Sequence, residues 1–474
     1  MAPPHPRSPR PSRRTLPRGS QALPREQVVA DQLQRLLLAM IDSVGEKGYR
    51  ATTISDLVGR AGVSRKTFYE HFASKQECLL ATFDVIAADG RRRAIDAYTQ
   101  ADGLQQGVEA AIGALFAATI ASPSAARLNM VEIVAAGPAG IERRERAAAE
   151  YRRFLRGMLQ QEPDDVQQEP DDAAVPDAVV RAVVGGLNRI LYSLVRHSQR
   201  PELHQLVTDL MRWVTCYRPT PAILAQYEEA AAPAAVADSG LRGGRAPGTL
   251  ASYAGGELKL ARGMTNVLRS FALHSQRERI LDAVANLTAT GGYADLTVEK
   301  IAGEAAMSLQ TFYDHFKSKE EAFLFAYEVG HSRGLALVER AYTAQSDWPR
   351  GVKAAIATLL RYLGSEPAFA RLALLHMLIA TPRTAERANA GITEYLSVLE
   401  PGFEETPEHR RPPAITIEAI GGGLFELMYH CIMRDRVAAL PSLTTHATYV
   451  ALAPFVGPEH AAQVAIEPLP EPLS

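Results

Sequence analysis

One stretch of sequence occurs twice in this chain, and it constrains the fold more than any other feature. Residues 53–75 read TISDLVGRAGVSRKTFYEHFASK, and residues 297–319 read TVEKIAGEAAMSLQTFYDHFKSK. In the first copy the hydroxyl residue Thr53 precedes apolar residues at helical spacing, which predicts a short capped helix. A small residue and a glycine then predict a turn, after which Ser64 is placed to cap a second helix. Each copy is therefore expected to form a helix-turn-helix.

The predicted second helix of the first copy has a basic, hydroxyl-rich outer face. Phe68 and Phe72 lie four residues apart, so both are expected to point into the protein. Arg65, Lys66 and Thr67 then remain outside, at the start of the helix. Such side chains at a helix N-terminus suit contacts to phosphates and base edges in a major groove. The alternative is a short helical pair that only packs, and the length of the ordered string argues against it.

The string from Ile54 to Lys75 closely resembles the DNA-binding head of TetR-family transcriptional regulators. It follows the pattern I-x-x-L-V-x-x-A-G-V-S-x-x-T-F-Y-x-H-F-x-x-K without a gap. Members of that family are homodimers whose two heads read the halves of a near-palindromic operator, and whose last two helices pair between subunits. The resemblance therefore implies double-stranded DNA and a small-molecule effector as partners, with no cofactor. It also implies a repressor that the effector releases from its operator.

The candidate DNA-binding residues occupy matching positions in the two copies. They are Thr53, Ser64, Arg65, Lys66, Thr67, Tyr69, His71 and Lys75 in the first copy, and Thr297, Ser308, Leu309, Gln310, Thr311, Tyr313, His315 and Lys319 in the second. The resemblance implies phosphate contacts for the threonine, tyrosine and lysine positions that the two copies share. Neither histidine has a second ligand at helical spacing, so no metal site is expected.

The repeat extends well beyond the helix-turn-helix. Adding 244 to a residue number in the first half gives its counterpart, as for Thr67 and Thr311 or Tyr151 and Tyr395. After the acidic stretch QEPDDVQQEPDD the offset becomes 237, and the difference equals the length of one QEPDDVQ unit. A small duplication inside this predicted surface loop explains the change. The chain is therefore expected to contain two complete TetR-like units joined head to tail.

The expected fold is all-α, with each unit built from a helix-turn-helix head and a helical body, and with the two units packed as an intramolecular pseudo-dimer. The expected divisions are a disordered basic arm (1–24), a first head (25–90), a first body (91–225), a linker (226–256), a second head (257–334), a second body (335–460) and a C-terminal tail (461–474). The pairing segments are expected at 177–197 with 202–217, and at 414–434 with 443–455. Glycines within them suit a close helix crossing, although a flexible kink is the alternative. A flexible linker of about 30 residues spans roughly 30 Å, enough to join the units.

The two heads differ in charge. Residues 1–72 contain 12 Lys and Arg against 6 Asp and Glu, whereas residues 245–316 contain 7 against 7. At the start of the recognition helix, Arg65 and Lys66 could read guanine or bind phosphate, while Gln310 could pair with adenine and Leu309 with a thymine methyl. The second head is therefore expected either to read a different, weaker half-site or to have stopped reading DNA. If only the first head reads DNA, two chains could associate to bind a palindrome.

The turn of the second head also departs from the pattern. Ala306 and Met307 replace Gly62 and Val63. This difference adds to the expectation that the two heads are not equivalent.

Apolar and aromatic residues of the bodies are candidates for an effector pocket. They are Phe116, Met130, Ile133 and Phe154 in the first half, and Tyr362, Phe369, His376, Met377 and Tyr395 in the second. The alternative for each is a place in the packed core, because apolar stripes on helices usually serve packing. An effector would act by binding a conformation whose head spacing no longer fits one turn of DNA.

Composition limits the other function classes. The net charge of −2 places any nucleic-acid site in a local patch, and the three cysteines have no metal-ligand spacing. No apolar run approaches a membrane span, and the basic N-terminus lacks a signal peptide's apolar stretch, so a cytoplasmic protein is expected. No nucleophile elbow or phosphate loop occurs, so no enzyme is expected. The rival to a regulator is a ligand- or protein-binding pseudo-dimer whose heads have lost DNA binding.

Overall fold

The computed structural model describes residues 25–160, 175–197, 202–217, 220–224 and 264–468. The predicted basic arm, the acidic loop and the linker lie outside these residues. Within the described ranges every regular element is a helix. The expected all-α class is therefore confirmed.

The helices of the first half follow the order that the repeat predicts. They are α1 (Arg25–Ala51), α2 (Ile54–Ala61), α3 (Arg65–His71), α4 (Lys75–Thr99), α5 (Leu104–Ala121), α6 (Pro123–Met130), the 3-10 turn η1 (Glu132–Ala136), α7 (Pro138–Gln160), α8 (Asp177–His197), α9 (Leu203–Thr215) and the short η2 (Ala222–Leu224).

The second half repeats this order with additional short helices, among which η3 is a π-helix and η4, η5 and η6 are 3-10 helices. Its elements are α11 (Met264–Asp295), α12 (Val298–Glu304), α13 (Leu309–His315), α14 (Lys319–Thr343), α15 (Trp348–Ser365), α16 (Pro367–Arg371), η3 (Leu372–His376), α17 (Met377–Ala380), α18 (Pro382–Leu396), η4 (Ser397–Leu399), α19 (Pro401–Glu405), η5 (Glu408–Arg410), α20 (Thr416–Met433), η6 (Val437–Leu443), α21 (Thr444–Val456) and α22 (Pro458–Ile466).

One predicted boundary is wrong. The C-terminal tail was expected from residue 461, but α22 continues the second body as far as Ile466. Its side chains Ala461, Ala462, Val464 and Ala465 are buried, and the helix packs against α21 and α15. Small apolar residues at helical spacing give this segment a buried face, which a solvated tail would lack.

Side-chain caps fix the starts of the head helices. Thr53 and Asp56 form a reciprocal capping box at α2, and Ser64 accepts a hydrogen bond from the Thr67 amide at α3. The second head repeats the arrangement, because Thr297 caps α12 and Ser308 caps α13. These caps satisfy backbone donors that a helix start leaves unpaired, so they set where each short helix begins.

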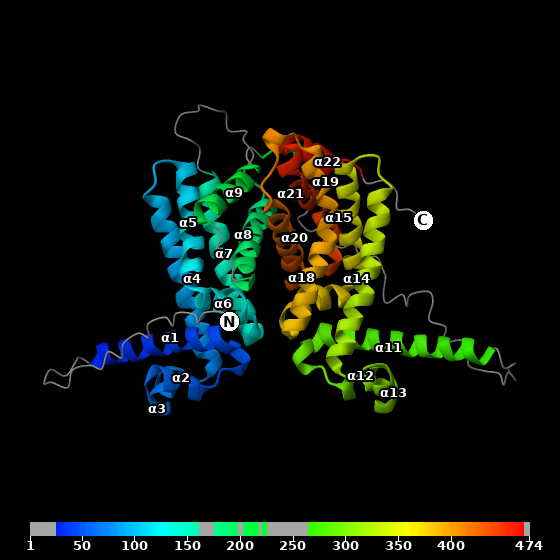
Figure 1. Ribbon diagram of the computed structural model, residues 1–474, viewed down its shortest axis with the longest axis horizontal. Coiled ribbons are helices and arrows are strands. Elements are labelled where there is room, and N and C mark those ends of the chain that lie inside the picture. The colour runs from blue at the N-terminus through cyan, green and yellow to red at the C-terminus, as the bar shows by residue number, and fades with distance from the viewer. Residues whose placement is uncertain (1–24, 161–174, 198–201, 218–219, 225–263, 469–474) are drawn as a thin grey trace, which may run out of the picture.

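The two halves stand side by side, with both heads at one end of the molecule and the bodies above them (Figure 1). Helices α8 and α20 lie between the bodies and cross closely. A Cβ atom at Gly185 would lie 2.6 Å from the Gly422 carbonyl oxygen, and one at Gly422 would lie 2.6 Å from the Gly185 oxygen. Only glycine permits this approach, which accounts for the glycines inside these helices. We call this α8–α20 contact the seam.

Three cores hold the molecule together. Each head shares a core with its own body, to which η1 contributes Ile133 in the first half and α17 contributes Met377 in the second. The third core runs through both bodies, where the buried Tyr217 donates a hydrogen bond of 3.0 Å to the Val450 carbonyl. A shift of a body helix therefore moves buried contacts of the head beneath it.

Two described helices have the length and apolar composition of a membrane span, although none was expected from the sequence. They are α5 and the residues Asp177–Arg196 of α8. The α8 window is 67% buried within the molecule because this helix forms the seam. A buried core helix passes the same test of length and composition.

Candidate nucleic-acid interface and effector pocket

Helix α3 presents a polar outer face on an aromatic base. Phe68 and Phe72 are buried in the core of the first head, whereas the side chain of Tyr69 is 56% exposed. Lys66 is exposed, with Glu70 at 3.9 Å. Arg65 donates a hydrogen bond of 2.7 Å to the Ser55 hydroxyl of α2, which holds the guanidinium beside the junction of the two helices. Several donors of this group remain available to a phosphate or a base edge.

The hydroxyl groups of Thr53 and Ser64 serve first as helix caps. Ser64 Oγ accepts from the Thr67 amide at 3.0 Å and lies 2.9 Å from Thr67 Oγ1. Thr53 Oγ1 hydrogen-bonds the Asp56 carboxylate at 2.6 Å. These side chains, like Thr297 and Ser308 in the second head, position the helix N-termini at which an anion would bind.

Lys75 and Lys319 bind backbone carbonyls in the two heads. Lys75 Nζ donates to the carbonyls of Tyr49 and Thr52 at 2.9 and 2.7 Å, and burial lowers its pKa. Lys319 Nζ repeats this with Tyr293 and Leu296 at 3.3 and 2.8 Å. An ammonium group has three donors, so each lysine retains one for a phosphate. In the structure, Lys75 connects the start of α4 to the end of α1, and Lys319 connects the start of α14 to the end of α11.

Helix α13 has the same geometry as α3 and a different chemistry. Leu309 and Tyr313 are 44% and 53% exposed at the positions of Arg65 and Tyr69. Gln310 donates to the Asp314 carboxylate at 3.1 Å. The cationic pair of the first head is thus replaced by an apolar side chain and a neutral amide.

The histidines of the two recognition helices are only partly exposed. His71 packs beside the ring of Phe72, and His315 lies 3.2 Å from the side-chain oxygen of Gln276 on α11. Thr311 is also partly buried, with its amide bonded to the cap Ser308. Among the described residues no group of acids, histidines and cysteines is arranged to hold a metal ion.

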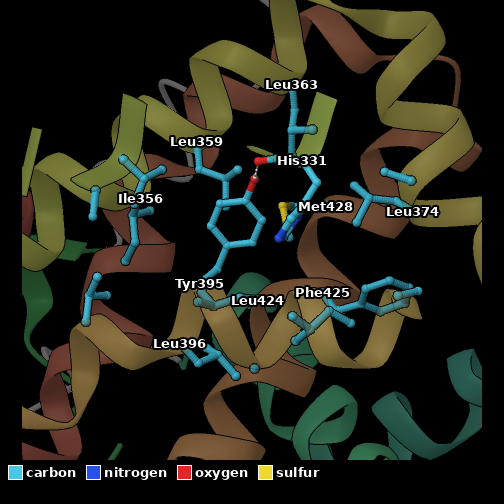
Figure 2. A pocket seen from close by; sticks show the side chains of 18 of the residues that line it. His331, Ile356, Leu359, Leu363, Leu374, Tyr395, Leu396, Leu424, Phe425 and Met428 are labelled. Atoms are coloured by element: carbon cyan, nitrogen blue, oxygen red, sulfur yellow. Dashed lines mark hydrogen bonds between the residues drawn. The ribbon is translucent and has the colours of Figure 1, made fainter. Parts of the chain in front are cut away.

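A cavity of about 110 Å³ lies inside the second body. Helices α14, α15, α18 and α20 surround it, and most of its wall is aliphatic (Figure 2). The ring of Tyr395 extends into this space, and its hydroxyl donates a hydrogen bond of 3.1 Å to the His331 carbonyl. Phe425 and Met428 of α20 form another part of the wall.

One end of this cavity carries linked polar groups. His331 Nε2 lies 2.5 Å from the Glu394 carboxylate, and its Nδ1 lies 3.5 Å from the Tyr327 hydroxyl. Arg387 donates to Glu394 at 3.1 Å from the outer side. A side chain at Gly391 would collide with the Tyr327 hydroxyl, so only glycine at this position leaves space for the stacked rings of Tyr327 and His331.

The nine candidate pocket residues fall in three places. Phe369 and Tyr395 line the cavity. Met130 and His376 line a cleft of about 1080 Å³ between the halves, where burial lowers the pKa of His376 to about 4. The remaining five, Phe116, Ile133, Phe154, Tyr362 and Met377, lie in packed regions of the cores. The structure therefore places these five side chains in packed cores, which is the alternative that the sequence left open for them.

Arg50 joins the first head to the second body across the cleft. Its guanidinium donates to the carbonyls of Ala380 and Ile379, at 3.0 and 3.2 Å, where α17 ends. A positive group suits the C-terminal end of a helix. The matching position of the second head is Ala294, so this contact has no symmetric counterpart there.

Ion pairs join the two halves at the seam and beside it, and in the following three the first half supplies the cation. Arg152 lies 3.5 Å from Glu426, and Arg189 lies 3.4 Å from Glu418. Arg196 reaches Glu386 of α18 at 3.4 Å. Burial raises the pKa of Glu426 to about 7 despite the nearby arginine.

Positions related by the repeat have opposite charges at the seam. With the offset of 237, Arg181 corresponds to Glu418, and Arg189 corresponds to Glu426. Helix α8 is therefore basic where α20 is acidic. This charge pattern was not predicted from the sequence, and neither were the contact of Arg50 and the polar end of the cavity at His331. Comparison of every pair of positions under the two offsets would have found them.

Comparisons with known proteins agree with the fold and the repeat. The model of the family described as "Bacterial regulatory proteins, tetR family" matches twice, at residues 37–82 and 280–324. The HTH-type transcriptional regulator BetI of Agrobacterium fabrum is 30% identical over 165 residues, which are 35% of this chain and 76% of that protein. CymR of Pseudomonas putida is 46% identical over 50 residues, which are 10% of this chain and 25% of that regulator.

Two solved structures of bacterial regulators each match less than half of this chain. The fatty acid degradation regulator FadR of Bacillus halodurans matches 39% of this chain and 94% of its own, with a TM-score of 0.35 and 15% identity. FadR of Bacillus subtilis, solved with stearoyl-CoA, matches 38% of this chain and 96% of its own, with a TM-score of 0.33 and 16% identity.

Proposed function

Because this chain belongs to the TetR family of bacterial transcriptional regulators, we propose that it is a single-chain repressor of an asymmetric operator, released by a small-molecule effector. In this proposal each chain carries both heads of a regulator that other members of the family assemble from two subunits. The two heads read half-sites about one DNA turn, or 34–36 Å, apart.

The difference between the recognition helices carries the proposal of an asymmetric site. Both helices have the same caps, the same aromatic base and the same lysine behind them. Their outward residues differ, with Arg65 and Lys66 in one head and Leu309 and Gln310 in the other. Direct readout depends on those outward side chains, so two such heads in one chain prefer different bases.

The charges at the seam support pairing within the chain. If α8 met a second α8, arginines would face arginines at positions 181 and 189. If α20 met a second α20, glutamates would face glutamates at positions 418 and 426. Both pairings bring like charges together in a buried contact, which costs several kcal/mol. The α8–α20 contact matches opposite charges, and the tether makes it independent of protein concentration.

Selection of DNA sites from a random pool by the purified full-length chain tests this function. We expect enriched sites with two dissimilar halves about one turn apart. A symmetric palindrome would contradict the asymmetric site and would assign DNA reading to the first head of two associated chains. Absence of enrichment at low salt, where phosphate contacts are strongest, would reject DNA binding and favour the ligand- or protein-binding pseudo-dimer.

A further inference from the structure

We propose that only the second body takes the effector, that one molecule binds per chain, and that this molecule is compact, uncharged and apolar. The cavity around Tyr395 is the site. This inference rests on the proposed function for the consequence of binding, but the binding itself is tested without DNA.

The wall of the cavity excludes a charged ligand. In the described part of the chain, its lining contains no Asp, Glu, Lys or Arg side chain. Burial of an unpaired charge in such surroundings is strongly unfavourable. The volume of about 110 Å³ is somewhat below the ~150 Å³ of an engineered apolar cavity that binds benzene. The volume therefore sets a single ring or a short branched chain as the upper limit on the size of the ligand.

The polar end allows at most one neutral polar group on the ligand. The Tyr395 hydroxyl uses its proton on the His331 carbonyl, and its oxygen retains a lone pair that can accept a hydrogen bond. His331 is already engaged by Glu394 at 2.5 Å. A hydroxyl or amide on the ligand could donate to Tyr395, and the rest of the molecule would contact carbon atoms.

The corresponding positions of the first body open onto the larger cleft between the halves, where Arg144, Tyr151 and Asn188 are among the lining residues. Ala388 and Leu396 line the cavity, and their counterparts under the offset of 244 are Arg144 and Arg152. Phe425 lines it as well, and its counterpart is the polar Asn188. Two guanidinium groups and an amide thus replace three apolar wall positions.

Arg152 already forms a buried ion pair with Glu426 of the other half. Its side chain is 12% exposed and lies 3.5 Å from Glu426. An apolar molecule at this position of the first body would have to separate the pair and leave a buried charge without a partner, which is strongly unfavourable. The histidine of the polar end is also replaced, because Ala87 stands at the position of His331, whereas Tyr151 corresponds to Tyr395 and donates to the Ala87 carbonyl at 3.5 Å.

The cavity shares a helix with the seam. Gly421, Leu424, Phe425 and Met428 of α20 line it, while Gly422 and Glu426 of the same helix contact the first half. A ligand in the second body therefore touches the element that sets the relation between the halves. In this inference the second half senses the effector, while the first half carries the cationic recognition helix.

Calorimetric titration of the DNA-free, full-length chain with toluene tests the inference, with benzoate and benzylamine as charged molecules of similar size. We expect toluene to bind with one equivalent per chain, and both charged molecules to bind about tenfold more weakly or worse. Leu359→Phe places a larger side chain in the cavity wall and should abolish toluene binding. The matched variant Leu115→Phe changes the corresponding position of the first body and should leave one equivalent bound.

Circular dichroism of each variant checks folding, and Met428→Phe provides a second block of the same cavity with Leu191→Phe as its match. Two equivalents of toluene, absence of toluene binding, equal binding of benzoate, or loss of binding in the first-body variants would each overturn the inference. Operator release is measured separately on the DNA complex. Binding of toluene without any effect on DNA affinity would therefore reject only the effector step of the proposed function.

Discussion

The two turns of the heads differ at one backbone position. Gly62 has a φ of 64°, and Ala306 adopts a φ of 50° at the corresponding place. A left-handed conformation costs a residue with a Cβ atom roughly 1–2 kcal/mol, and glycine avoids that cost. Ala306→Gly should therefore stabilise the second helix-turn-helix by about 1 kcal/mol, and Gly62→Ala should destabilise the first by a similar amount. Native-state hydrogen exchange of the α13 and α3 amides measures both effects, and changes of the same sign in the two heads would contradict the explanation.

Glu426 gives the stability of the seam a pH dependence. Its pKa is raised to about 7 by burial, among Arg144, Arg152, Arg181 and Glu145. In the unfolded chain this glutamate loses its proton near the ordinary pKa of 4.5, so between these values the folded state binds more protons and the free energy of unfolding falls as pH rises.

Glu426→Gln removes this titration. The stability of the variant relative to the natural protein should rise by about 3 kcal/mol between about pH 5 and about pH 8, with no further change above. Thermal unfolding of both proteins at the two pH values measures the difference. A difference that shrinks with rising pH would show that the ionised glutamate is the favoured form in the folded seam.

At the scale of elements, the recognition helices predict opposite effects of exchanging two residues. Arg65→Leu with Lys66→Gln gives α3 the outward pair of α13, whereas Leu309→Arg with Gln310→Lys does the reverse. If both cations contact phosphates, the first exchange lowers the slope of log affinity against log salt by about 1.8. The second exchange should raise the slope, because it adds two cations to the outer face of α13. Fluorescence anisotropy on the selected operator over a salt series measures this, and an unchanged slope in the first variant would show that neither cation contacts a phosphate.

The head helices could be predicted from sequence because their determinants are local. A hydroxyl cap, an apolar spacing and a turn lie within a few residues of one another, and Thr53 and Ser64 cap the helices as expected. The helical end of the chain was missed because alanines signal a buried face weakly. The cavity was only partly found, since Phe369 and Phe116 have equal apolar character in the sequence, and only long-range packing places one at a cavity and the other in the core.

At the scale of the whole molecule, the two halves of the repeat differ in features that identical subunits would have in common. The first half has the cationic recognition helix, Arg50 and the basic seam residues. The second half has the apolar cavity and the acidic seam residues. Residues at the two ends of one symmetric contact can differ only when both are encoded in one chain, or in two different chains. The opposite charges at positions 181 and 418, and at 189 and 426, are therefore a difference that only joined or non-identical halves can have.

The seam charges predict which chains can pair. Glu418→Arg with Glu426→Arg makes both seam helices basic, and Arg181→Glu with Arg189→Glu makes both acidic. Each double variant should weaken its own seam by about 3 kcal/mol or more, through like charges held in close contact. All four substitutions together restore opposite charges with the signs exchanged, and should recover much of the lost stability.

A mixture of the two double variants tests directly whether charge at the seam determines which helices pair. Within either chain the seam is repulsive, whereas the basic helices of one chain complement the acidic helices of the other. We expect the natural protein to have the mass of one 51.4 kDa chain, each double variant alone to be expanded at that mass, and the mixture to form a species of about twice that mass. Native mass spectrometry distinguishes these species. A natural protein that is already a dimer, or double variants that stay compact and do not combine, would show that charge at the seam does not choose the partner.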